Sequence, residues 1–344
     1  MRIAQVAPLY ESVPPQAYGG TERVVAYLTE ALVEQGHAVT LFASGDSTTR
    51  AELVPISPQS LRLDPECVDQ LAHHMLLLEQ VFRQADRFDI VHFHIDYLHF
   101  PLTRRMALPH LTTLHGRLDI PDLVPLYQEY REMPVVSISD HQRQPLPWLN
   151  YQGTVYHGLP ADLHTFHPNA GTYLAFLGRI SPEKGVDQAI AIAREAGMPL
   201  MIAAKVDPAD QNYFDEVVRP LLDEPGVEFI GEIGEAEKDA FLGDAYALLF
   251  PIDWPEPFGI VMIESLACGT PVIAFRHGSV PEVLEHGVTG LIVEDAAGAV
   301  RAVERVLRID RRLCRQAFER RFTAARMAEG YLKLYRRLAR SHER

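Results

Sequence analysis

Residues 247–275 read ALLFPIDWPEPFGIVMIESLACGTPVIAF, and this stretch decides the fold class. Its two ends, ALLFPI and PVIAF, are apolar runs of strand length, and an apolar helix is predicted between them from Gly259 onward. A strand, a helix and a second strand in this order are typical of a parallel sheet whose strands are joined by helical crossovers. Ligands of such sheets bind beyond the carboxyl ends of the strands, so the loop before this helix is a candidate site.

The same alternation of strands and helices runs along the whole chain. Strands are predicted in the first half at RIAQVAP, AVTLFAS, DIVHFH, HLTTLHG and PVVSIS, and in the second half at YLAFLGRI, PLMIAA, VEFIGEI, ALLFPI and PVIAF. One helix is predicted from about Thr21 to a stop at Gly36. Another covers 65–85, with one apolar stripe formed by Leu71, Met75, Leu78 and Phe82.

A polar stretch at 156–172, YHGLPADLHTFHPNAGT, interrupts the alternation, and we place a domain boundary there. The length of 344 residues suits two domains of about 150 residues each. We therefore predict an α/β protein with two Rossmann-like, doubly wound parallel-sheet domains, at 1–160 and 170–321. A last helix at about 322–341 carries an apolar face formed by Met327, Tyr331, Leu334, Tyr335 and Leu338.

The composition excludes several classes of protein. Lys and Arg total 32 and Asp and Glu total 46, so the net charge of −14 argues against binding of nucleic acid. Cys67, Cys268 and Cys314 lie far apart, with no metal-ligand spacing and no disulfide framework, which indicates the cytoplasm. No window has the ~20 apolar residues that a membrane span needs, whereas association with a membrane surface stays open.

Two cations follow a predicted strand in LAFLGRISPEKGVDQAI. We expect the strand to end at about Leu177 and a helix to open near Gly185, so that Arg179 and Lys184 lie in the turn between them. Two cations beside the free N–H groups of a helix start would bind a diphosphate. The alternative is a pair of solvated loop cations. The chain has no Walker A lysine and no G-x-G-x-x-G, which disfavours ATPase and dinucleotide-binding functions.

The loop at 256–260 combines a carboxylate, a proline and a glycine before the predicted helix. Pro257 suits the approach to a helix start, and Gly259 lets the backbone approach a ligand closely. Phosphate oxygens would accept hydrogen bonds from the amides of Phe258, Gly259 and Ile260, and Glu256 would accept from sugar hydroxyls.

Glu264 lies about one turn into the same predicted helix, where its carboxylate would accept from ribose hydroxyls. The alternative is a buried structural acid. Its apolar neighbours make an unpartnered carboxylate costly, so Glu264 needs a partner in either case.

The first half offers weaker signals. Gly19 and Gly20 precede a helix start, which suits an anion but is also an ordinary turn. His115 follows the strand in HLTTLHG, where a lone histidine is more often structural. His92 and His94 alternate along DIVHFH and therefore share one face of a strand, so we interpret both as core residues.

GRISPEKG, followed by EPFGIVMIESLACGTPVIAFRHGSVPEVLEHGVTGLIVE, resembles the bacterial family 4 glycosyltransferases. The resemblance extends over nearly the whole chain, including YGGTERVV, TLHG and VYHGLPADLHTFHP, and keeps an E-x7-E motif at Glu256 and Glu264. It implies retaining chemistry and the GT-B fold, with a first domain for the acceptor and a second for the donor. The last helix is expected to pack back on the first domain.

The resemblance also implies roles for single residues. Arg179 and Lys184 would bind the donor diphosphate, Glu256 the transferred sugar and Glu264 the ribose. Phe258, Gly259 and Ile260 would offer backbone contacts. Glu232 and Ile233 would border the nucleobase. Gly20, with Gly19 directly before it in the chain, would approach the diphosphate. His115 would lie near the reacting sugar. The residues implied to act in catalysis are His115, Glu256, Arg179 and Lys184.

The expected enzyme is a hexosyltransferase that uses a nucleoside-diphosphate sugar, with UDP or GDP as the expected nucleotide, and an unknown acceptor. We expect no cofactor and no metal ion, because ADRFD (85–89) and DPAD (207–210) are not D-x-D motifs beside an apolar strand. Two alternatives stay open: a sugar-nucleotide epimerase on the same fold, and a nucleotide-sugar-binding protein without turnover.

Overall fold

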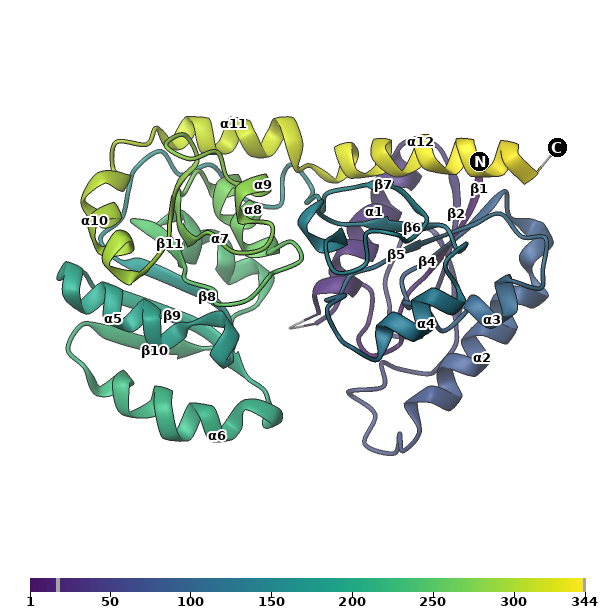
Figure 1. The fold of residues 1–344 in the computed structure, drawn as a ribbon, viewed down its shortest axis with the longest axis horizontal. Coiled ribbons are helices and arrows are strands. Elements are labelled where there is room, and N and C mark those ends of the chain that lie inside the picture. The colour runs from purple at the N-terminus through teal and green to yellow at the C-terminus, as the bar shows by residue number, and fades with distance from the viewer. Residues whose placement is uncertain (17–18, 343–344) are drawn as a thin grey trace. The chain divides into compact units, whose positions relative to one another are not determined.

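The computed structural model describes residues 1–16 and 19–342, so Tyr18 of the YGG sequence lies outside the described residues. The chain forms two compact units, shown in Figure 1. Unit 1 comprises Met1–Pro160 and Thr323–Arg344, and unit 2 comprises Ala161–Phe322. The chain therefore leaves unit 1 after Pro160 and returns to it at Thr323.

The described part of unit 1 is built on a seven-stranded sheet in the order β3-β2-β1-β4-β5-β6-β7, and every strand pair is parallel. The strands are β1 (Arg2–Val6), β2 (Ala38–Ala43), β3 (Glu52–Pro55), β4 (Ile90–Phe93), β5 (His110–Thr113), β6 (Val135–Ser137) and β7 (Tyr151–Thr154). The helices are α1 (Gly20–Glu34), α2 (Gln70–Arg83), α3 (Phe100–Thr103), α4 (Leu123–Glu129) and α12 (Ala324–His342).

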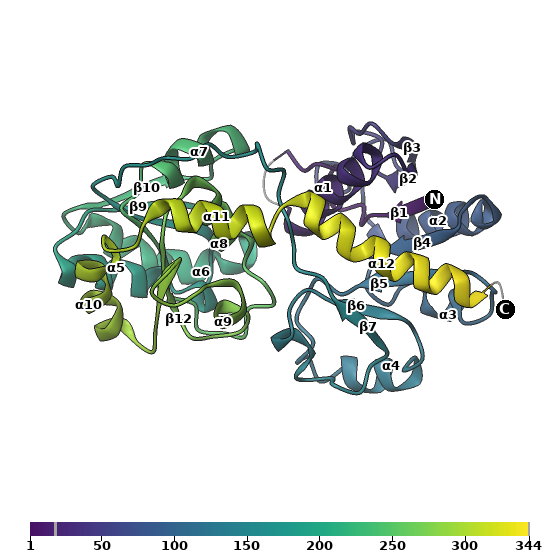
Figure 2. The same cartoon turned by 90° about the horizontal axis from the view of Figure 1, so that it is seen from above.

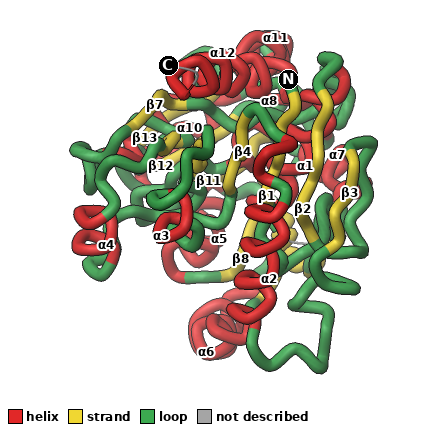
Figure 3. Tube along the Cα trace, turned by 90° about the vertical axis from the view of Figure 1, so that its right-hand side faces the viewer, coloured by secondary structure: helices red, strands yellow, loops and turns green. Residues whose placement is uncertain are grey.

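The side chains of strand β4 point alternately to the two faces of this sheet. Val91 and Phe93 belong to the apolar core that includes Leu78 and Val81 of α2, and Figure 3 shows α2 beside the strands. His92 and His94 point to the opposite face, which α12 covers (Figure 2). Both histidines are buried, so the prediction that they belong to the core is confirmed.

The stripe predicted for α2 is correct for Leu78 and Phe82, which pack in the core, and wrong for Leu71 and Met75. Leu71 and Met75 are 56% and 51% exposed, whereas the helix buries His74, Leu77, Leu78 and Val81. A mixed helix offers two overlapping apolar stripes, and packing on β2 selects the one that includes the histidine. No helix among the described residues is long and apolar enough to cross a bilayer.

The described part of unit 2 holds a six-stranded parallel sheet in the order β10-β9-β8-β11-β12-β13. The strands are β8 (Leu174–Ile180), β9 (Leu200–Val206), β10 (Val227–Gly231), β11 (Ala247–Phe250), β12 (Val272–Phe275) and β13 (Gly290–Val293). The helices are α5 (Val186–Ala196), α6 (Gln211–Tyr213), α7 (Glu235–Gly243), α8 (Ile260–Cys268), α9 (Val280–Val283), α10 (Ala296–Val306) and α11 (Arg311–Arg321).

In both sheets the strand order reverses direction after the central strands, as in doubly wound folds. The prediction of two Rossmann-like parallel-sheet units is therefore confirmed. In unit 2, α5 packs on α10 while α8 packs on α7 and α11, and α8 also contacts β11 and β12. The start of α8 thus lies directly beyond the carboxyl end of β11, where the sequence predicted a site.

Candidate functional site

The start of α8 is a turn that requires glycine. Gly259 is the N-cap residue, with a φ of 76° in the left-handed region. A Cβ added at this position would lie 2.9 Å from Phe250 Cζ and 2.9 Å from Met262 Cε, so the backbone passes close to both side chains. The first N–H groups of any helix have no partner within it, so the amides at Gly259 and Ile260 suit an anion.

Glu256 faces a cation and an indole at this helix start. Lys184 Nζ donates to Glu256 Oε2, and Trp254 Nε1 donates to the same oxygen at 2.8 Å. Lys184 Nζ also lies 5.1 Å from the centre of the Trp254 ring. The Lys184 and Glu256 side chains are only 18% and 12% exposed, so Lys184 is not the solvated loop cation of the alternative interpretation. Trp254 was not among the predicted site residues, although DWPEPFG places it two residues before Glu256.

Arg179 lies beside Lys184 in the sequence but has different partners. Strand β8 continues to Ile180, so Arg179 belongs to the strand and not to the predicted turn. Its NH2 donates to Glu183 Oε1 at 2.7 Å, and Asp207 and Asp210 lie 3.7 Å from the guanidinium. The strand extends because β9 pairs with it as far as Val206, a partner that the local sequence does not reveal. Arg179 is thus surrounded by carboxylates, whereas Lys184 meets Glu256.

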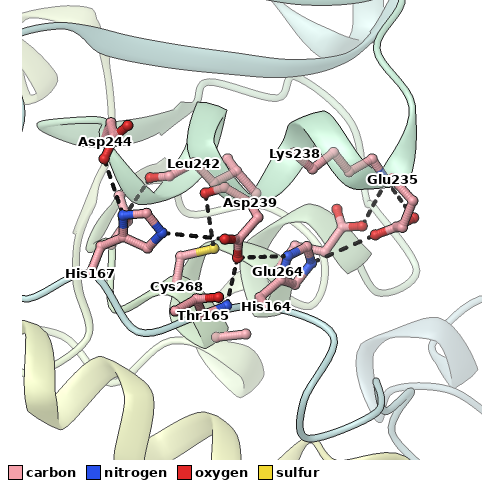
Figure 4. A network of polar contacts seen from close by, with 12 residues as sticks. His164, Thr165, His167, Glu235, Lys238, Asp239, Leu242, Asp244, Glu264 and Cys268 are labelled. Carbon is pink, nitrogen blue, oxygen red and sulfur yellow. Dashed lines mark hydrogen bonds and ion pairs between the residues drawn. The ribbon is translucent and has the colours of Figure 1, made fainter.

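Glu264 is buried and paired with a cation that the sequence analysis did not single out. Lys238 Nζ, on α7, donates to Glu264 Oε1 at 2.9 Å and to Glu235 Oε2 at 3.3 Å (Figure 4). The side chains of Lys238 and Glu264 are 7% and 3% exposed. The partner required for this carboxylate is therefore Lys238. A lysine three residues into EAEKDAFLG is an ordinary surface pattern, so no sequence signal identified it.

His164 is the centre of the only clusters of potential metal ligands in the described part of the chain. One contains His164, Asp239 and Cys268, and the other contains His164, Glu235 and Glu264. The carboxylates of both already accept hydrogen bonds. Lys238 donates to Glu235 and Glu264, and the N–H of Thr165 donates to Asp239 Oδ1 at 2.5 Å. The protein itself supplies the cation here, and burial lowers the pKa of His164.

The loop between β10 and α7 carries Glu232 and Ile233. Glu232 is exposed and Ile233 is half-buried. Glu237 Oε2 accepts from the N–H of Gly234 at 2.8 Å, which fixes the first turn of α7 directly after them. Helix α7 also carries Lys238, which donates to Glu264 of α8. The loop with Glu232 and Ile233 is therefore joined directly to the helix that supplies this lysine.

A second loop, after β12, is hydrogen-bonded to the backbone of the 256–259 segment. Ser279 N donates to the carbonyl of Glu256 at 3.0 Å, and Ser279 Oγ donates to the carbonyl of Phe258 at 2.7 Å. A Cβ on Gly278 would lie 2.3 Å from the Glu256 carbonyl oxygen, so only glycine permits this approach. Neither residue stands out in the sequence, since GSVPE resembles a common turn before a short helix.

Gly19, Gly20 and His115 belong to unit 1. Gly19 is the N-cap residue of α1 and Gly20 is its first residue, just after the loop that follows β1. His115 follows β5, and its ring stacks on His157 with centroids 5.4 Å apart. All three lie beyond the carboxyl ends of strands in one sheet.

The site in unit 2 can hold an anion at the start of α8 and hydroxyl-bearing groups on either side of it. Backbone amides and Lys184 supply positive charge, while Glu256 and Glu264 supply hydrogen-bond acceptors eight residues apart. A phosphate between two sugars has this pattern of charge and hydroxyl groups.

Comparison with known proteins assigns both units to families. The model described as Glycosyl transferases group 1 matches residues 165–321, and the model described as Glycosyltransferase Family 4 matches residues 18–148. Phosphatidyl-myo-inositol mannosyltransferase from Mycolicibacterium smegmatis is 27% identical, and the match covers 90% of this chain and 86% of that protein.

Solved structures share the whole architecture. AviGT4, a glycosyltransferase involved in avilamycin A biosynthesis, has a TM-score of 0.74 at 25% identity, with 98% of each chain covered. Anabaena Alr3699/HepE in complex with UDP and glucose has a TM-score of 0.73 at 16% identity, with 97% of this chain and 98% of that chain covered. At this identity the second likeness shows the fold alone.

Proposed function

The chain belongs to the family 4-like glycosyltransferases of the GT-B fold, and from this premise we propose that it is a retaining enzyme that uses a nucleoside-diphosphate sugar. The observation that carries the proposal is the meeting of Lys184, Glu256 and the start of α8 beyond β11. Such a group of cation, carboxylate and free amides suits a diphosphate that is attached to a sugar.

We assign donor binding to unit 2. Lys184, Arg179 and the amides of 258–260 would bind the diphosphate, and Glu256 would accept from the hydroxyls of the transferred sugar. Glu264 would accept from the ribose, and Glu232 with Ile233 would border the nucleobase. UDP or GDP is the proposed nucleotide, because the cation, the carboxylates and the helix start suit a diphosphate that carries a sugar.

We assign the acceptor to unit 1, where Gly19 and Gly20 would offer a helix start to an anion and His115 would contact a hydroxyl group of a sugar. The acceptor would be a hydroxyl-bearing molecule: a glycan, a lipid-linked sugar or a natural product. The proposed location is the cytoplasm, which agrees with three free cysteines, and reversible association with a membrane surface is compatible with it.

We further propose that the leaving nucleoside diphosphate is stabilised without a metal ion. Cleavage of the sugar–phosphate bond adds negative charge to the diphosphate, and fixed cations and amides aimed at that charge stabilise it. Lys184 is already held in place by Glu256 and Trp254, so little reorganisation is needed.

The test combines binding and turnover. UDP-, GDP-, ADP- and dTDP-sugars are screened by thermal shift, because a ligand at ~100 times its Kd stabilises by about 2.7 kcal/mol. Turnover of the donor that binds is then measured with an acceptor pool in excess EDTA, and we expect full activity. Lys184→Ala and Arg179→Ala should each lower turnover by roughly 10²–10³, the range for one preorganised group.

Arg276→Ala is the matched control, because Arg276 forms a surface ion pair with Glu294 in the same unit. Activity that EDTA abolishes and Mg²⁺ or Mn²⁺ restores would contradict the metal-free mechanism. A donor that binds without turnover with any acceptor would favour the binding-protein alternative, and epimerised donor would favour the epimerase.

A further inference from the structure

A chain of buried hydrogen bonds in unit 1 connects helix α12 with His115. Tyr335 Oη lies 2.6 Å from His92 Nδ1 and 3.1 Å from Gln5 Nε2. Gln5 Oε1 lies 2.8 Å from His94 Nε2, and His94 Nδ1 lies 2.9 Å from His115 Nε2. Four segments that are distant in sequence therefore meet on the sheet face beneath α12.

The distances at Tyr335 fix the direction of these hydrogen bonds. A separation of 2.6 Å suits a phenol that donates to an imidazole nitrogen, and 3.1 Å suits an N–H donor better than an O–H donor. Tyr335 therefore donates to His92 and accepts from the amide nitrogen of Gln5. The reverse direction would require the phenol to donate over the longer of the two distances.

The donor and the acceptor of each further hydrogen bond follow from the bond before it. Because the amide nitrogen of Gln5 points at Tyr335, its oxygen points at His94 and accepts from Nε2–H. A neutral imidazole has one donor and one acceptor nitrogen, so His94 Nδ1 is an acceptor. His115 must then donate its Nε2–H to His94, and this leaves His115 Nδ1 without a proton.

His115 Nδ1 is a hydrogen-bond acceptor that the protein leaves unused. It is shielded from solvent and has no hydrogen-bond partner among the described residues. Burial lowers the pKa of His115 to about 3 and the pKa of His94 well below its usual range, so both rings are neutral at pH 7. An unpaired buried acceptor is costly unless a ligand supplies a donor.

We propose that Gln5 and His94 are positioning residues that hold His115 in its Nε2–H form, so that Nδ1 accepts a hydrogen bond from a hydroxyl group of the bound substrate. This role of His115 rests on the proposed glycosyl transfer, whereas the tautomer itself does not. A ring of the opposite tautomer would present a donor to the same hydroxyl, which would then have to turn its own proton away. The network therefore decides which way the substrate hydroxyl points.

The tautomer is tested without any substrate. ¹⁵N spectra of the histidine-labelled full chain, with the His115 signals assigned by loss in His115→Gln, should show an unprotonated Nδ1 and a protonated Nε2. A protonated Nδ1 would overturn the proposal, whatever reaction the enzyme performs. A failure to find any turnover would overturn the proposed function and leave this measurement intact.

Kinetics test the positioning role with two variants of one residue. In His94→Asn, the side-chain oxygen lies the same number of bonds from the backbone as Nδ1 and still accepts from His115, so we expect near wild-type kcat. His94→Phe keeps a planar aromatic ring and removes the acceptor, so kcat should fall on the order of 10–100-fold, with the Kd of the nucleoside diphosphate unchanged. Equal kcat values in the two variants would contradict the positioning role.

His99→Phe is the matched control. His99 is also buried in unit 1 and is hydrogen-bonded to Thr103 and Thr112, but it does not contact His115. This change should leave kcat and the His115 spectrum unaltered. If His99→Phe lowered kcat as much as His94→Phe, the loss would reflect general damage to the core and the proposal would fail.

Discussion

At the scale of single residues, the two glutamates of the E-x7-E motif have different environments. Glu256 lies just before the start of α8, where it is hydrogen-bonded to Lys184 and Trp254. Glu264 lies within α8, where it is buried and paired with Lys238. A buried ion pair adds little net stability, but removal of one partner leaves an uncompensated charge. The Lys238 pair therefore lets a charged acceptor exist where the apolar face of α8 would otherwise exclude it.

Glu264→Gln should weaken donor binding by roughly 1.5–3 kcal/mol, because one carboxylate oxygen that would accept from the ribose becomes an amide donor. Lys238→Met is the matched variant, since it breaks the same ion pair and keeps the carboxylate. Calorimetric titration with the donor measures the affinity, and urea unfolding measures the stability of each variant.

We expect Lys238→Met to lower the stability by about 3–5 kcal/mol and to retain most of the donor affinity at temperatures where it is folded. Glu264→Gln should show the affinity loss instead. If the folded Glu264→Gln protein bound the donor as the wild type does, Glu264 would be a structural acid and the ribose assignment would be wrong.

At the scale of elements, the start of α8 depends on backbone conformation and on close packing together. Gly259 and Gly287 have nearly equal φ values of 76° and 79°, but only Gly259 has neighbouring atoms within 3.0 Å of an added Cβ. The two glycines therefore separate backbone strain from steric displacement.

Gly287→Ala should cost about 1–2 kcal/mol of stability from the left-handed backbone alone and leave donor binding unchanged. Gly259→Ala should cost more and should also abolish measurable donor binding, because the new methyl pushes the first turn of α8 away from Phe250. Thermal unfolding and calorimetric titration check both. Equal effects of the two substitutions on binding would show that no ligand uses the amides of this turn.

At the scale of the whole molecule, the histidines make unit 1 sensitive to acid. His92, His94, His99 and His157 are buried, and burial lowers the pKa of each well below 6.5. The unfolded chain therefore binds more protons than the native protein below pH 6.5. This contribution to stability is complete above pH 6.5 and is lost as the pH falls.

Buried Glu22 acts in the opposite direction, because burial raises its pKa to about 7 and the native protein holds its proton. The buried histidines outnumber Glu22, so stability should fall as the pH falls from 8 to 5. Urea unfolding at pH 5–8 measures this dependence. His99→Phe should make the dependence on pH shallower, and an unchanged slope would show that His99 does not contribute.

The sequence by itself determined the class of fold and located most of the candidate site in unit 2. Apolar runs of strand length that alternate with helical patterns leave few arrangements other than parallel sheets, because buried strands and crossover helices follow from local periodicity. The loop after ALLFPI was located for the same reason, since a helix start with Gly259 is a local feature.

The tertiary structure alone decided which side chains face one another. Lys238 pairs with Glu264 because α7 packs on α8, and Arg179 joins a strand because β9 extends beside it. His115 acquires its tautomer from Gln5 and Tyr335, which lie 330 residues apart. Periodicity describes how each segment is folded, but contacts between segments depend on packing of the whole unit, and the protonation of a buried ring depends on those contacts.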